Sequence, residues 1–151
     1  MPRIASSRIR GVSSSLAHEI VATIVSGIGA GRQFVALPWF REAVRRAVGF
    51  DPYPGTLNVR VVDDAGLACW RRLRGARGMR IDGPDVASCG GTLVPVMIED
   101  VLPAAVIVPD VTRHADDLLE VIAEVHLKSR LGRGDGDTIA IVEPRTRREA
   151  R

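Results

Sequence analysis

Two polar side chains follow a rigid corner in the middle of the chain, and their types suit metal or phosphate chemistry. The corner, residues 49–55, contains two prolines, which fix φ, and Gly55, which tolerates positive φ. Thr56 and Asn58 come next, two residues apart, so in a strand both side chains point to the same face. A hydroxyl and a carboxamide side by side form an oxygen-rich platform for a hard cation or for ligand phosphates. A polar strand edge after a tight turn is the alternative interpretation.

A glycine-rich segment at residues 27–32 is a candidate phosphate-binding loop. Its alternate glycines allow backbone N–H groups to approach an anion, and Arg32 adds a guanidinium group. The segment is not a dinucleotide-binding fingerprint, because Arg32 takes the place of the third glycine and a strand is expected next. It is not a P-loop either, since no Gly-Lys-Ser/Thr closes it. A plain hairpin turn is the alternative.

Polar residues in the last third of the chain offer fewer specific patterns. Residues 112–117 supply a hydroxyl, an imidazole and two carboxylates, but no Ser or Cys nucleophile elbow accompanies them, so a catalytic triad is not indicated. A solvated loop is favoured there over metal binding by His114 and Asp116. Glu120 and Glu124 lie in a strongly apolar run. Burial of a carboxylate without a partner is unfavourable, so each either faces solvent or contacts a ligand.

Composition limits the class of protein. The chain has 151 residues, of which 46% are hydrophobic and 26% charged, which is typical of one soluble globular domain. No apolar run approaches the roughly 20 residues of a membrane span, and no signal-peptide pattern begins the chain. Cys69 and Cys89 have no metal or redox spacing, so we expect a cytoplasmic protein without a membrane partner. A net charge of only +3 and 4% aromatic residues argue against a nucleic-acid partner.

Short strands dominate the predicted secondary structure. Residues 38–48 are the clearest helix, since Pro38 suits the first position and apolar residues recur at helical spacing before Gly49. A shorter helix is expected at residues 67–73. Residues 116–128 fit both a helix and an alternating strand, and the pattern alone slightly favours the helix. The expected strands are residues 20–26, 34–37, 57–62, 79–81, 91–98, 104–108 and 138–142. Many short strands with one clear helix predict a closed or nearly closed β-barrel.

Taken together, these stretches resemble the archaeal-type CTP-dependent riboflavin kinase family. The matching parts are residues 25–32, 34–38, 49–59 and 105–137, in the order and spacing of that family. The resemblance implies a mainly β fold, a six-stranded cradle-loop β-barrel with one clear helix at about residues 38–48 and short helical turns. It also implies a strand, not a helix, at residues 118–128.

The resemblance and the composition together divide the chain into three parts. We expect a loose N-terminal lead-in at residues 1–18, a riboflavin kinase-like barrel domain at residues 19–143, and a basic tail at residues 144–151.

The family resemblance also implies an enzyme that transfers a phosphoryl group from CTP to the ribityl 5′-hydroxyl of riboflavin, giving FMN and CDP with Mg²⁺. Carried over residue by residue, it assigns the metal to Thr56 and Asn58 and the flavin to Thr112 and Glu120. Glu120 is the candidate catalytic residue, orienting and deprotonating the attacking hydroxyl. The nucleotide-binding residues it implies are Gly27, Ile28, Gly29, Ala30, Gly31, Arg32, Val125, His126, Leu127 and Lys128.

The chain departs from the family pattern at several positions of the nucleotide side. The family usually has Glu at the position of Ala30, an aromatic residue at Gln33, Pro at Glu124 and Arg at Lys128. Ala30 and Gln33 leave the preference for CTP open. The alternative function is a catalytically inactive flavin- or nucleotide-binding barrel module. A DNA-binding regulator is a third hypothesis, because the family domain also occurs fused to a helix-turn-helix segment, but residues 1–18 show no such pattern.

Overall fold

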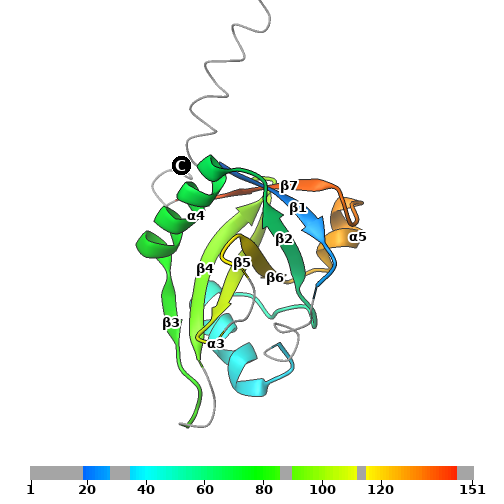
Figure 1. Cartoon of the computed structure of the whole chain (residues 1–151). Coiled ribbons are helices and arrows are strands. Elements are labelled where there is room, and N and C mark those ends of the chain that lie inside the picture. Colours follow the sequence, from blue (N-terminus) through cyan, green and yellow to red (C-terminus); the bar gives the residue numbers. More distant parts are fainter. Residues whose placement is uncertain (1–18, 28–34, 86–89, 112–114, 146–151) are drawn as a thin grey trace, which may run out of the picture.

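The fold is built from seven strands and three helices in the described part of the computed structural model, residues 19–27, 35–85, 90–111 and 115–145 (Figure 1). The strands are β1 (Glu19–Val25), β2 (Leu57–Val61), β3 (Met79–Ile81), β4 (Gly91–Ile98), β5 (Leu102–Pro109), β6 (Leu118–Ala123) and β7 (Thr138–Val142). The helices are α3 (Pro38–Val48), α4 (Asp64–Arg77) and α5 (Leu127–Leu131).

Six of the strands close into an antiparallel barrel. The sheet order is β3-β4-β5-β6-β2-β1-β7, and a further pairing of β4 with β7 closes the ring, leaving β3 as an extra strand beside β4. Alternate residues of each strand fill the interior, as Ile20, Ala22 and Ile24 of β1 do. Helix α4 packs against β1 and β4 (Figure 1). Its Trp70 is 1% exposed and belongs to the same core. The predicted six-stranded barrel is confirmed.

A second hydrophobic core lies on the outside of the barrel, under α3. Phe40 and Val44 of the helix are fully buried and belong to one cluster with residues of β4, β5 and β6. The strand residues of this cluster are Leu93, Ala105, Ile107 and Ile122. Strands β5 and β6 therefore have apolar neighbours on both faces, the barrel interior on one side and α3 on the other.

Burial on both faces explains why β6 was ambiguous from sequence. All six residues of β6 are buried, so its apolar residues do not alternate cleanly with polar ones. The slight preference for a helix was wrong, and the strand implied by the family resemblance is confirmed for Leu118–Ala123. That strand is shorter than the predicted residues 118–128, because the chain turns after Ala123 and Leu127–Leu131 forms α5.

Two other predicted elements differ from the structure. The strand predicted at residues 34–37 is not formed by the described residues 35–37. Val35 is helical and packs into the core under α3, and the chain turns at Ala36 before that helix begins. The helix predicted at residues 67–73 is longer, since the Asp63 side chain caps it by accepting a 2.8 Å hydrogen bond from the Gly66 N–H. The predicted bounds of α3, β3, β4 and β7 agree with the structure.

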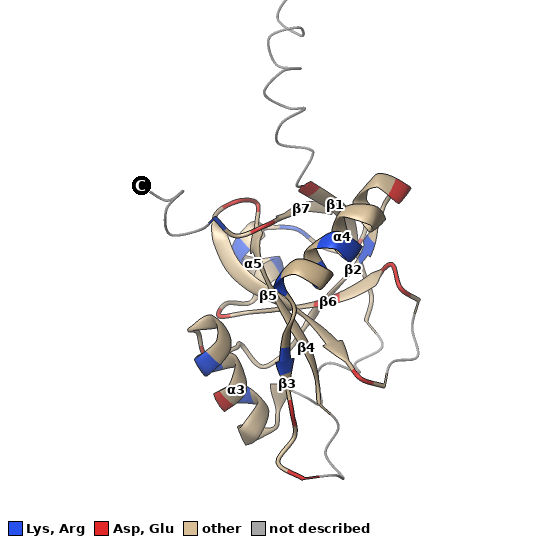
Figure 2. Cartoon of the chain, turned by 90° about the vertical axis from the view of Figure 1, so that its left-hand side faces the viewer, with Lys and Arg blue, Asp and Glu red and all other residues tan. Residues whose placement is uncertain are grey.

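Charged residues lie on the outer faces of α3 and α4 (Figure 2). Arg41 on α3 pairs with Asp51 at 3.0 Å, and Arg71 on α4 pairs with Asp116 at 2.9 Å. Arg71, Arg72 and Arg74 of α4 are exposed to solvent, and Arg77 pairs with Glu143 at 2.8 Å. None of the helices described here has the length and apolar character needed to cross a membrane.

Candidate active site

A buried pair of polar residues lies on the outer face of the barrel, where β2 meets β6. Asn58 and Glu120 are directly opposite each other in the antiparallel ladder and are 6% and 0% exposed. Their strand neighbours Val59 and Leu119 point into the barrel, so the two polar side chains share the outer face. Side chains in this arrangement have Cβ atoms about 4.5–5.5 Å apart. The pair therefore forms one polar locus at the edge of the α3 core.

Asn58 has an unused acceptor. Its Oδ1 atom is buried and accepts no hydrogen bond from any residue the structure describes. An acceptor left in this state is unfavourable by about 1–3 kcal/mol, so the position favours a bound hydrogen-bond donor or cation. The sequence-based expectation that Asn58 contacts a ligand agrees with this geometry.

Gly27 lies directly over the Asn58 side chain. Strand β1 pairs with β2 so that Val25 is opposite Asn58, and the chain continues over the carboxamide. A Cβ atom added at Gly27 would lie 2.0 Å from Asn58 Nδ2 and 2.7 Å from Asn58 Cγ. Only glycine fits there without displacing Asn58. The first residue of the glycine-rich segment is thus fixed beside the candidate metal ligand.

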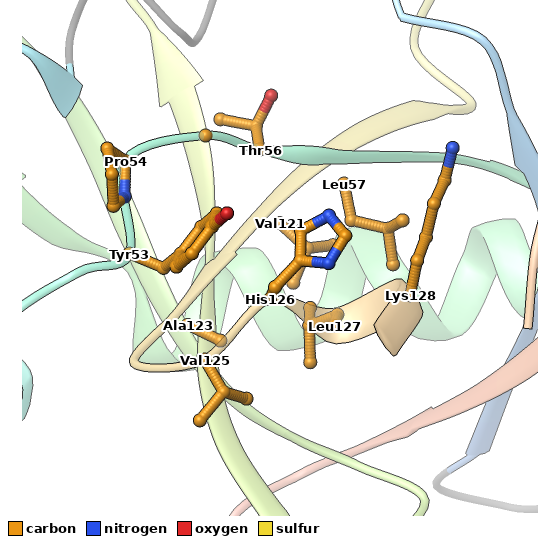
Figure 3. Close-up of a pocket in the computed structure, with 11 residues that line it drawn as sticks. Tyr53, Pro54, Thr56, Leu57, Val121, Ala123, Val125, His126, Leu127 and Lys128 are labelled. Carbon is orange, nitrogen blue, oxygen red and sulfur yellow. The ribbon is translucent and has the colours of Figure 1, made fainter. Parts of the chain in front are cut away.

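A cavity of about 470 Å³ lies where β2 begins and β6 ends (Figure 3). Leu57 and Val121, which line it, are the strand neighbours of Asn58 and Glu120. Its walls come from the Pro-Gly corner with the start of β2 and, later in the chain, from the end of β6 with the start of α5. The lining residues are Tyr53, Pro54, Gly55, Thr56, Leu57, Val121, Ala123, Val125, His126, Leu127 and Lys128. Thr56 and the four predicted nucleotide-binding residues at 125–128 are therefore brought together.

Tyr53 and His126 form an aromatic pair inside the cavity. Their ring centroids are 5.1 Å apart, and Figure 3 shows the two rings side by side. The Tyr53 N–H donates to the Ala123 carbonyl at 2.7 Å, which ties the corner to the end of β6. His126 Nδ1 lies 2.6 Å from Ser129 Oγ. Tyr53 was not among the predicted site residues, although a tyrosine flanked by two prolines in the corner was a usable signal.

Lys128 reaches from α5 along one side of the cavity (Figure 3). Its Nζ donates to Asp135 Oδ1 at 2.9 Å, and Ser26 Oγ donates to Asp135 Oδ2 at 2.9 Å. The hydrogen bond from Lys128, with that from Ser26, holds the pKa of Asp135 below its usual value. Asp135 was also not among the predicted site residues, although the stretch it belongs to matched the family.

The described residues place the predicted site only in part. Gly27, Asn58 and Glu120 adjoin one another, and Thr56 and residues 125–128 line the cavity. Ile28, Gly29, Ala30, Gly31, Arg32 and Thr112 lie outside the described residues. Within the described ranges, no three His, Cys, Asp or Glu side chains form a metal centre. A cation at this locus would instead use the neutral oxygens of Thr56 and Asn58, completed by its ligand.

The fit of Gly27 over Asn58 makes a testable prediction about stability. Gly27→Ala is expected to lower the free energy of unfolding by about 1–3 kcal/mol, because the added methyl group overpacks against Asn58. In an Asn58→Ala background the same substitution should be tolerated, giving a coupling energy of at least about 1 kcal/mol in urea unfolding. Gly134→Ala is the control, since its methyl group would meet nothing within 4 Å. Strict additivity of the two substitutions would contradict the proposed contact.

Comparisons with known proteins identify the family of this chain. The family model CTP-dep_RFKase, described as a domain of unknown function (DUF120), matches residues 24–142. A riboflavin kinase of Saccharolobus solfataricus is 33% identical over 126 residues, which cover 82% of this chain and 72% of that protein. Riboflavin kinases of Thermofilum pendens and Methanosarcina mazei are each 36% identical, over 89% and 80% of this chain. The matched parts are 63% and 54% of those two proteins. The chain belongs to the CTP-dependent riboflavin kinase family.

Proposed function

We propose that this protein phosphorylates riboflavin, transferring the terminal phosphoryl group of CTP to the ribityl 5′-hydroxyl to give FMN and CDP. The observation that carries the proposal is the buried Asn58–Glu120 pair beside the cavity, in a member of a riboflavin kinase family. Phosphoryl transfer needs little covalent chemistry from the protein, because positioning and charge stabilisation supply most of the catalysis. The locus offers positioning, since its polar groups are held at fixed positions on paired strands, and a bound cation would supply the charge stabilisation.

Mg²⁺ would be held by Thr56 and Asn58. The residues fit such an ion, since Asn58 Oδ1 is a buried acceptor without a hydrogen-bond partner among the described residues, and Thr56 is half-buried just before the same strand. When bound, the ion would offset the negative charge of the donor phosphates and of the transferred group. Two neutral ligands leave the ion its full positive charge for those phosphates.

Glu120 would orient the attacking hydroxyl and accept its proton. The carboxylate is fully buried directly opposite Asn58, so an acceptor on Glu120 lies beside the candidate metal ligand. A general base must lie within hydrogen-bonding reach of the proton that it accepts, and a side chain fixed on a central strand keeps that position. Thr112, the second flavin contact expected from the family, lies outside the described residues.

The cavity would bind the donor nucleotide. Its volume of about 470 Å³ lies in the range of small-molecule sites, about 300–1,000 Å³. The rings of Tyr53 and His126 offer flat surfaces for a base, and Lys128 offers a positive charge for phosphate oxygens. CTP is proposed as the donor from the family to which the chain belongs.

The direct test is to incubate the protein with riboflavin, Mg²⁺ and one nucleoside triphosphate at a time. We expect FMN by liquid chromatography, with the highest kcat/KM for CTP among CTP, UTP, ATP and GTP, and loss of the product with EDTA. Tight riboflavin binding without FMN from any donor would contradict the proposal and favour an inactive binding module. If FMN formed at the same rate in EDTA, the proposed Mg²⁺ site would be contradicted, but the proposed kinase activity would not.

Glu120→Gln tests the role of the buried carboxylate. The amide keeps the shape of the side chain but cannot accept a proton, so kcat should fall by about 10²–10⁴-fold. The matched control is Glu124→Gln, because Glu124 lies four residues further along the chain and is exposed to solvent. It should leave kcat within about twofold. A Glu120→Gln protein with wild-type unfolding and wild-type kcat would remove Glu120 from the catalytic role.

A further inference from the structure

One carboxylate joins the two sides of the proposed nucleotide site. Asp135 accepts a hydrogen bond from Lys128 Nζ on one oxygen and from Ser26 Oγ on the other, each at 2.9 Å. Lys128 lines the cavity, and Ser26 immediately precedes Gly27, which lies against Asn58. Ser26 and Asp135 are 109 residues apart in the chain. The contact therefore links the end of β1 to the first turn of α5 through a third segment.

The loop that carries Asp135 is itself fixed to the barrel. The Gly136 N–H donates to the Ile24 carbonyl, and the Ile24 N–H donates to the Asp137 carbonyl, both at 2.8 Å. The Asp137 side chain accepts from the Gly134 N–H at 2.8 Å, which closes the turn. Gly136 has φ +94°, a left-handed conformation that favours glycine. Asp135 thus projects from a backbone that is bonded to β1.

The exposure of the pair limits its contribution to folding stability. The Lys128 and Asp135 side chains are 40% and 51% exposed, and ion pairs of this kind contribute little to stability. A lysine side chain is flexible, however, so a fixed carboxylate reduces the number of conformations that it must lose when it binds an anion. The ammonium group has three donors, and only one is needed for Asp135.

We propose that Asp135 is a positioning residue for the donor nucleotide. Its carboxylate holds the Lys128 ammonium group beside the cavity and, through Ser26, ties that lysine to the end of β1. Phosphate oxygens would then meet a preorganised cation. The hydrogen bonds that keep the pKa of Asp135 low are consistent with an ionised anchor. This inference rests on the proposed function, because it needs a nucleotide in this cavity.

Asp135→Asn tests the inference with little change in shape. The amide removes the negative charge that holds Lys128, so we expect KM for CTP to rise about tenfold while KM for riboflavin stays within about twofold. Asp100→Asn is the matched control. Asp100 forms a comparable exposed pair with Arg145 at 2.8 Å, is 50% exposed, and has a positive φ that Asn tolerates. The control should change neither KM.

Two further readouts separate positioning from a purely structural role. In a Lys128→Met background, Asp135→Asn should raise KM for CTP by less than twofold, since its effect passes through Lys128. Calorimetric titration with Mg²⁺–CDP should show a tenfold loss of affinity in Asp135→Asn, and this measurement does not depend on turnover. If the wild type bound CDP but formed no FMN, only the proposed function would be refuted. Three results would overturn the inference. They are an unchanged or tighter CDP affinity in Asp135→Asn, an equal effect of Asp135→Asn on KM for CTP in the Lys128→Met background, and no CDP binding by the wild type.

Discussion

The register between β2 and β6 is the constraint on which the candidate site depends. It places Asn58 opposite Glu120 on the outer face, while Leu57, Val59 and Leu119 fill the barrel. A slip of one residue in either strand would reverse its faces, turning its polar side chain into the barrel interior and its apolar side chains outward. The hydrophobic core therefore fixes the position of the polar pair. Fold stability and site geometry have the same physical origin here.

Closure of the barrel extends this constraint to the neighbouring segments. Strand β2 pairs with β1 on its other edge, which sets Gly27 over the Asn58 carboxamide. Ser26, the residue that follows β1, contacts Asp135 beyond α5. The end of β1 is thus next to both the Asn58 side chain and the Asp135 contact. A buried acceptor on Asn58 that has no donor among the described residues is unfavourable for folding alone, and a bound ligand provides a physical reason to keep it.

The sequence predicted those parts of the structure that local patterns determine. Pro38, the helical spacing that follows and Gly49 identified α3, and alternation with turn residues identified several strands. Strand β6 could not be assigned from its pattern, because it is buried on both faces and its periodicity is weak. The strand predicted at residues 34–37 was wrong for a related reason. Val35 is an apolar residue because it packs under α3, and not because it belongs to a sheet.

Site residues that depend on long-range contacts were the hardest to predict. Thr56, Asn58 and Glu120 were identified because their types and spacing matched a family, and the structure adds the register that makes two of them neighbours. Asp135 and Tyr53 are relevant to the candidate site because they contact Lys128 and His126, respectively. No local sequence pattern indicates these contacts. Their partners are neighbours in space because of the barrel, so tertiary structure was needed to recognise them.

The most direct test of the central claim is a crystal structure of the protein with riboflavin, CDP and Mn²⁺ in place of Mg²⁺, in which anomalous scattering locates the cation. The account predicts a cation bonded to Asn58 Oδ1, at about the 2.1 Å expected for Mg²⁺, with the ribityl hydroxyl beside Glu120. A cation bound elsewhere, with Asn58 Oδ1 contacting only protein donors, would contradict it.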